Sequence, residues 1–129
     1  MTFIQGDQLD RELCLSLLAR STIGRLGLIL GPMPFVHPVR YFVRRSHLLF
    51  GLSADQLARE VDDVVVALQA DGFDEDRGHY WTVVAVGPST PVAVTSEVPS
   101  DIVRHGLHAF RLRPKLFSGH WLGSPPAPF

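Results

Sequence analysis

The stretch IGRLGLILGPMPFVHPVRYFVRRSHLLF, residues 23–50, decides the fold of this chain. Ile23–Leu30 is rich in aliphatic side chains, Phe35–Val43 is again strand-like, and His47–Phe50 is a short apolar run. Gly31–Pro34 and Arg44–Ser46 separate these runs with residues that favour chain reversal. The stretch therefore predicts three short strands in a meander, typical of a half-open β-barrel and of a mainly β protein.

Glycine inside the first of these strands is unusual because it weakens a strand. Gly24 or Gly27 is therefore expected at a bulge, or where another backbone or a ligand comes close.

Further elements are expected on both sides of the meander. Asp7 and Asp10 are both suitable N-caps for a helix that ends near Arg20 and closes one end of the barrel. After the meander we expect a short helix at residues 53–60 and two strands at residues 64–70 and 80–86. Another helix is expected at residues 99–107, followed by a late strand at residues 108–112. A polar turn is expected at residues 71–74. Prolines 88, 91 and 99 are expected to interrupt regular structure around residues 92–94, which could still pair at a sheet edge.

Composition narrows the class of protein. A chain of 129 residues fits one domain, here expected at residues 1–122 with a Pro-rich tail at 123–129. A net charge of −1 argues against nucleic-acid binding, and no apolar run is long enough for a membrane span. The lone Cys14 lies among leucines, which predicts a small buried hydrophobe and fits a reducing cytoplasm. A hydrophobic content of 46% favours a homodimer that hides the excess apolar surface.

Four sequence blocks carry a family resemblance through their order and spacing. They are LDRELCLSLLARSTIGRLGLI, PFVHPVRYFV, HLLF and VVVALQADGFDEDRGHYWTVVAVGPST, between about residues 9 and 90, with a weaker echo in FRLRPKLFSGHWL. In this respect the chain resembles the pyridoxamine 5′-phosphate oxidase-like, flavin-binding split-barrel family. The resemblance implies a six-stranded split β-barrel that forms a homodimer, with FMN in a groove between the subunits. Family members oxidise or reduce small organic molecules, or only bind the cofactor.

The resemblance also implies a set of cofactor-binding residues. On the second strand, Pro38, Val39, Arg40 and Tyr41 match the positions that lie against the flavin ring. The family holds the phosphate with an Arg-Thr motif after the third strand and with a lysine that opens the next helix. Here Phe50 is followed by Gly51, Leu52 and Ser53, and Gln56 stands at the lysine position, so the resemblance implies Phe50, Ser53 and Gln56 as cofactor-binding residues in this region. Replacement positive charge could come from Arg40, Arg44, Arg59, Arg111 or Arg113.

Two functions therefore stay open. The first is a flavin-dependent oxidoreductase for a small organic ligand. The second is a catalytically silent dimer that has lost the phosphate clamp and binds a ligand or a partner. Trp81, in the place of the family's Gly-Trp-Ser tryptophan, is either a wall of the flavin groove or a core residue.

Other polar residues give weaker signals. His37 lies inside a strand, where it is either a proton donor to a bound ring or a partner in a barrel hydrogen bond. His105 and His108 have helical spacing but no evident third metal ligand. The acidic cluster at residues 71–76 is expected to be a solvated turn. Arg111 and Arg113 face either water or an anion. The serines lack a nucleophile elbow, so the sequence does not support hydrolase chemistry.

Overall fold

The computed structural model describes residues 8–53, 55–93, 95, 97–104 and 107–124. Its elements, in chain order, are α1 (Arg11–Leu18), β1 (Ile23–Leu30), β2 (Met33–Arg44), β3 (His47–Leu52), α2 (Asp55–Glu60), β4 (Val64–Asp74), β5 (His79–Pro91), α3 (Ser100–Arg104), β6 (His108–Leu112) and β7 (Leu116–Gly123). None of the helices among these described residues has the length and apolarity needed to cross a bilayer.

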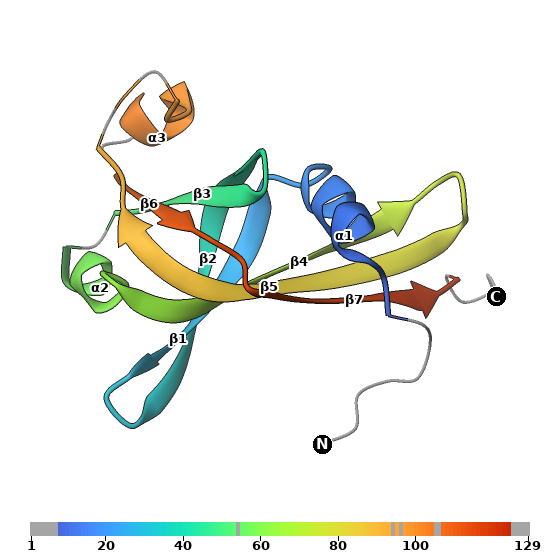
Figure 1. Cartoon of the computed structure of the whole chain (residues 1–129), viewed down its shortest axis with the longest axis horizontal. Coiled ribbons are helices and arrows are strands. Elements are labelled where there is room, and N and C mark those ends of the chain that lie inside the picture. Colours follow the sequence, from blue (N-terminus) through green and yellow to red (C-terminus); the bar gives the residue numbers. More distant parts are fainter. Residues whose placement is uncertain (1–7, 54, 94, 96, 105–106, 125–129) are drawn as a thin grey trace, which may run out of the picture.

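The strands form one antiparallel sheet that closes on itself (Figure 1). The order is β4-β1-β2-β3-β6-β5, and pairing of β4 with β5 completes a six-stranded barrel. The remaining strand, β7, adds to the outer edge of β5. The predicted mainly β, split-barrel fold is confirmed. Sequence reasoning did not predict β7 as a strand.

Helix α1 packs against the barrel on β4, β5 and β7. The side chain of Asp10 accepts a hydrogen bond from the amide of Leu13 at 2.8 Å, so Asp10 is the N-cap, whereas Asp7 lies outside the described residues. Cys14 is buried as predicted, and burial raises the pKa of its thiol. The phenol of Tyr41 donates a 2.6 Å hydrogen bond to the carbonyl of Leu18, which fixes the end of α1 to β2.

The predicted turn at residues 71–74 is wrong, because these residues continue β4. They pair with residues 79–82 of β5, and the chain reverses only after Asp74. The Asp-Gly dipeptide that suggested a turn is accommodated because Gly72 faces the large ring of Trp81. A Cβ at Gly72 would lie 2.7 Å from that ring. The acidic cluster is also not uniformly solvated, since Asp74 is buried.

Proline 88 does not interrupt regular structure but lies within β5. Its carbonyl accepts from the amide of Arg113 at 3.1 Å, and its missing N–H points away from the β4 ladder. Beyond β5, Val92 makes one backbone hydrogen bond to Ala109, but it belongs to no strand. The predicted helix at 99–107 is shorter, because α3 ends at Arg104. At the first hairpin, Met33 and Pro34 belong to β2 rather than to the turn.

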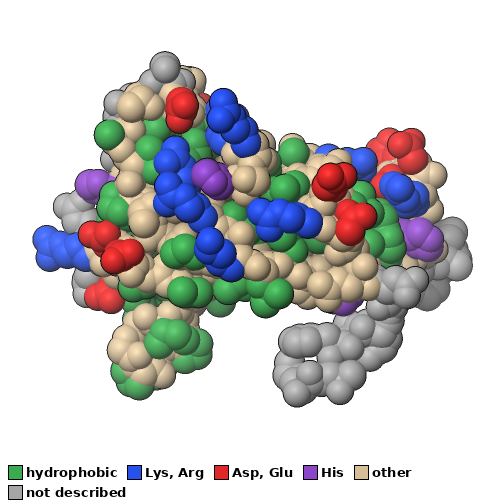
Figure 2. Space-filling model, in the orientation of Figure 1, with side chains coloured by type: hydrophobic (Ala, Val, Ile, Leu, Met, Phe, Trp, Pro, Cys, Tyr) green, Lys and Arg blue, Asp and Glu red, His purple; other side chains and the backbone are tan. Residues whose placement is uncertain are grey.

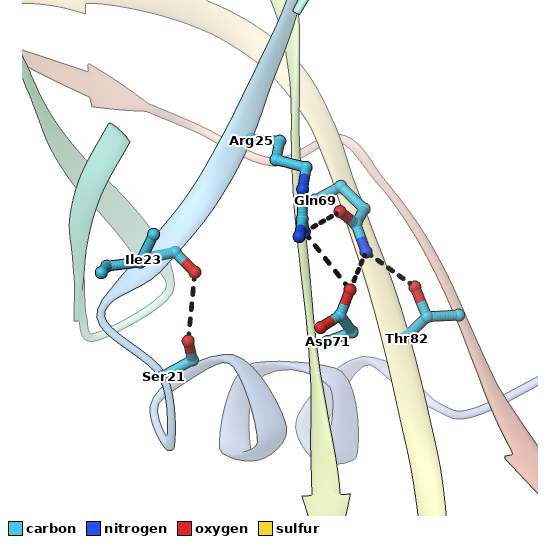
Figure 3. A network of polar contacts seen from close by, with 6 residues as sticks. All are labelled: Ser21, Ile23, Arg25, Gln69, Asp71 and Thr82. Carbon is cyan, nitrogen blue, oxygen red and sulfur yellow. Dashed lines mark hydrogen bonds and ion pairs between the residues drawn. The ribbon is translucent and has the colours of Figure 1, made fainter. Parts of the chain in front are cut away.

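The two glycines of β1 have different surroundings. A Cβ on Gly24 would lie 2.8 Å from the carbonyl oxygen of Gln69, so Gly24 allows the close approach that the sequence predicted. A Cβ on Gly27 would meet only ordinary contacts at 3.8 Å or more. Beside Gly24, the guanidinium of Arg25 bonds to Gln69 and Asp71, and Gln69 donates to Thr82 (Figure 3). This polar network joins β1, β4 and β5.

Candidate functional site

The barrel is split where β2 leaves β3. Strand β2 pairs with β1 over residues 33–40 but with β3 only over Tyr41–Arg44. Strand β3 continues without β2 and pairs with β6 through Gly51 and Leu52. The part of β2 before Tyr41 therefore has one edge that pairs with no other strand in the described chain.

The backbone groups at this open edge follow from strand geometry. The amide of Tyr41 donates to the carbonyl of Thr22, so Tyr41 turns its backbone toward β1. Backbone groups alternate between the two edges of an antiparallel strand, so those of Val36, Pro38 and Arg40 point to the open edge. Pro38 offers only a carbonyl there, whereas Val36 and Arg40 each offer a donor and an acceptor.

A cavity of about 280 Å³ lies along this split. It brings together four of the eight residues predicted for the cofactor site, namely Pro38, Val39, Arg40 and Ser53. The other lining residues are His37, Gly51 and Leu107. We call this cavity the β2 cleft.

The other predicted site residues lie elsewhere, and the structure does not describe the side chain of Gln56. Tyr41, Phe50 and Trp81 are buried in the main core. Burial raises the pKa of Tyr41 to about 12, so its phenol keeps its proton and its bond to α1. Phe50 stacks on Phe110 with ring centroids 5.6 Å apart. Trp81 is a core tryptophan, and a flavin contact by any of the three stays a prediction.

Charge in the β2 cleft comes from Arg40, whose guanidinium is half exposed. It lies 3.5 Å from the carboxylate of Asp101, so the arginine connects β2 to α3. On β3, a Cβ at Gly51 would lie 2.8 Å from the Leu107 side chain, which explains how Leu107 can close so tightly over the strand. Sequence reasoning missed Leu107. The glycine after Phe50, at a position facing the cleft, was the available signal.

The remaining candidates are spread over the molecule. His37 lines the β2 cleft and stacks on Phe35, with ring centroids 6.2 Å apart. His108 is the first residue of β6, so it does not share a helix with His105, which lies outside the described residues. In the described part of the chain no three metal-ligating side chains come together. Arg59 lines a separate cavity beside α2, and Arg44 and Arg111 line another cleft at the far end of β3.

This fold and site define a split-barrel protein with an open strand edge beside a cleft. The family model for pyridoxamine 5′-phosphate oxidase matches residues 10–116, and the chain belongs to that family. The uncharacterised protein Rv0080 of Mycobacterium tuberculosis is 31% identical over 97 residues, which cover 70% of this chain and 64% of the relative. The chain thus spans less than two thirds of that relative's length.

Solved structures confirm the fold. A FAD-binding protein from Mycobacterium smegmatis superposes with a TM-score of 0.71 at 21% identity, covering 88% of this chain and 96% of that one. A FAD-binding protein from Mesorhizobium loti superposes with a TM-score of 0.73 at 19% identity, covering 88% and 95%. At these identities the likeness establishes a shared fold.

Proposed function

We propose that this chain is a flavin-binding oxidoreductase that acts on a small organic molecule, with the flavin in the β2 cleft between two copies of the chain. The observation that carries the proposal is the open edge of β2. There the backbone groups of Pro38 and Arg40 face a cavity in a protein whose family and fold neighbours include flavin-binding members.

The residues of the cleft fit a flavin. The ring's pyrimidine edge carries alternating donors and acceptors, which the N–H and C=O groups along β2 can match. Arg40 and the hydroxyl of Ser53 supply a cation and a donor for the phosphate. The sequence predicts FMN, but the two solved neighbours are named as FAD-binding. Both flavins share the mononucleotide part, which is the part this cleft would hold.

A second copy of the chain supports the proposal in two ways. At about 280 Å³, the cleft of one copy is slightly below the roughly 300–1,000 Å³ of ligand pockets, so another surface is needed to enclose a flavin. The hairpin of β1 and β2 extends beyond the barrel (Figure 1) and exposes apolar side chains, among them Ile29, Met33 and Val36. Together with Val65 of β4, Ile29 and Val36 line one apolar surface that is suited to a dimer.

When bound, the flavin supplies hydride acceptance and donation, and the chain supplies its environment. Val39 and Leu107 exclude water from the cleft. The backbone N–H groups of β2 would donate hydrogen bonds to the ring edge where negative charge develops on reduction. His37 is the candidate proton donor to a bound substrate, because this residue lines the same cavity.

Titration of the purified protein with FMN, FAD and riboflavin tests the proposal. We expect absorbance near about 450 nm with saturable binding of one flavin per chain. A preference between FMN and FAD identifies the cofactor, and a lower affinity for riboflavin measures the phosphate contact.

The variant Arg40→Gln should weaken FMN binding about tenfold. Arg25→Gln, which alters an arginine outside the cleft, should leave FMN binding unchanged. Gln56→Lys should strengthen FMN by restoring the family's charge. A protein that ignores millimolar flavin would contradict the proposal.

The alternative is a catalytically silent dimer that uses the same cleft for another ligand. The ion pair between Arg40 and Asp101 favours this alternative, because Asp101 already neutralises part of the positive charge that a flavin phosphate would need. Asp101→Asn separates the two functions. If the protein is a flavoprotein, this substitution should tighten FMN binding, and in a silent protein it should leave flavin binding absent.

A further inference from the structure

A cleft of about 370 Å³ lies at the far end of β3 from the β2 cleft. Its lining residues are Arg44, Arg45, His47, Leu49, Glu97 and Arg111. Gly51 of the β2 cleft and His47 of this cleft are four strand residues apart, which is about 13 Å along β3. We call it the arginine cleft. Figure 2 shows basic side chains gathered around a histidine on the face where Figure 1 places β3 and β6.

The charges of the arginine cleft are not balanced. Three arginines line it, and Glu97 is the one carboxylate among its described lining residues. Glu97 lies 3.7 Å from Arg111, at the long end of an ion pair, and its side chain is 71% exposed. Arg44 and Arg45 make no ion pair with a described carboxylate. Clustered like charges with one weakly held counter-ion are typical of a surface that binds an anion.

The backbone at Arg45 gives a second, independent observation. Arg45 and Ser46 form the two-residue turn between β2 and β3, and Arg45 has φ of 57°. Glycine, asparagine or aspartate normally occupies such a position, because a Cβ disfavours the left-handed region. An arginine is held there at a conformational cost, and it lines the cleft. Strained residues of this kind cluster at ligand sites.

The positive charge of the arginines also acts on His47, the histidine of the cleft. Burial and the nearby arginines 111, 113, 11 and 45 lower the pKa of His47. Glu97 is the opposing charge that lines the cleft. A bound anion would favour the protonated imidazole and raise the pKa of His47, so this pKa would report whether the cleft is occupied.

We propose that the arginine cleft is a binding site for a small phosphate monoester, separate from the flavin site. The guanidinium groups of Arg45 and Arg111 would hold the phosphate oxygens, which match their planar donors. Glu97 occupies the Arg111 side of the site when no ligand is present and is displaced on binding. The cleft is larger than phosphate alone requires, so Leu49 and Arg44 would contact the organic part.

Titration with inorganic phosphate and with glycerol 3-phosphate at constant ionic strength tests this site. We use calorimetry together with NMR signals of the His47 ring, with glycerol as the uncharged control. We expect saturable binding of one ligand per chain and a rise in the pKa of His47 on binding. The double variant R45Q/R111Q should lose about tenfold or more in affinity, and Arg25→Gln, remote from the cleft, should lose none.

The variant Glu97→Gln is a control for misfolding, because a misfolded protein would lose affinity. This variant should instead bind phosphate several-fold more tightly than the wild type. Linear, unsaturable shifts, or equal affinity in R45Q/R111Q, would overturn the proposal. Flavin binding is measured on the same variants. If R45Q/R111Q loses FMN as well as phosphate, the arginine cleft belongs to the flavin site and the separate site is refuted. A protein that binds no flavin but retains saturable phosphate binding would refute only the proposed function.

Discussion

The β2–β3 and β4–β5 hairpin turns of the barrel handle charge in opposite ways. At the turn between β4 and β5, Asp74 is buried but fully compensated. Its carboxylate accepts from Arg77 at 2.7 Å and lies 3.3 Å from Arg20, and it also accepts from the amides of residues 76 and 77. At the turn between β2 and β3, arginines gather around His47 with one exposed carboxylate. The first arrangement stabilises the fold, whereas the second leaves cationic donors for a ligand.

The pKa shifts support the same distinction. Burial alone would raise the pKa of Asp74, but hydrogen bonds from Arg77 and the charge of Arg20 hold the pKa below its usual value. The native structure therefore favours the ionised carboxylate at the β4–β5 turn. At the β2–β3 turn, burial and like charge oppose ionisation of His47. Ionisation is favourable at one turn and unfavourable at the other.

The largest expected effect comes from removing the compensated charge. Asp74→Asn leaves Arg20 and Arg77 without their shared partner and weakens the turn, so we expect the melting temperature to fall by roughly 5–10 °C. Asp71→Asn is the matched control, because that carboxylate is half exposed and pairs with a half-exposed Arg25. The control should change the melting temperature by no more than about 2 °C. Equal effects of the two variants in thermal unfolding would remove the contrast.

The sign of an arginine substitution should differ between the two turns. Arg77→Gln loses the ion pair to Asp74 and the contact of the guanidinium with Trp121, 5.1 Å from the ring centroid. We expect a fall of about 2–5 °C. Arg45→Gln removes one of several like charges, and should leave the melting temperature unchanged or raise it by about 1–2 °C. Thermal unfolding at low salt measures both. Destabilisation by Arg45→Gln equal to that of Arg77→Gln would show that the arginine cleft is a structural cluster.

The sequence predicted one of these turns better than the other. The turn predicted at Arg44–Ser46 was placed to within one residue, because apolar runs lie close on either side, although Arg44 is the last residue of β2 and only Arg45 and Ser46 form the turn. The β4–β5 turn was placed too early, since Asp-Gly is a strong local turn signal and nothing local shows that Gly72 accommodates Trp81. Strand β7 was missed because its pairing with β5 is long-range.

The candidate site shows the same limit. The family resemblance predicted eight cofactor-site residues, and the structure gathers four of them, Pro38, Val39, Arg40 and Ser53, in one cavity. Strand periodicity also indicates that Tyr41 faces away from its neighbour Arg40. The sequence could not show that α3 brings Asp101 to Arg40, or that Leu107 closes on Gly51, because both contacts depend on how the chain returns after β5.

The smallest expected effect is the dependence of stability on pH at the arginine cleft. Since the pKa of His47 is lowered on folding, the unfolded chain binds more protons than the folded chain between the folded value and the ordinary value near 6.5. Stability contributed by the neutral imidazole is therefore fully present above about pH 6.5 and is lost as the pH falls through this window. Asp74, whose pKa is also lowered, loses its contribution only at more acidic pH, below the ordinary carboxyl range near about 4.

We expect melting temperatures measured between pH 8 and pH 5 to fall by about 1–2 °C less in His47→Gln than in the wild type. Arg45→Gln should reduce the same slope, because it removes one of the charges that oppose protonation of His47. An NMR titration that places the pKa of His47 at or above 6.5 in the wild type would contradict this account, and would mean that the arginines around it are already neutralised.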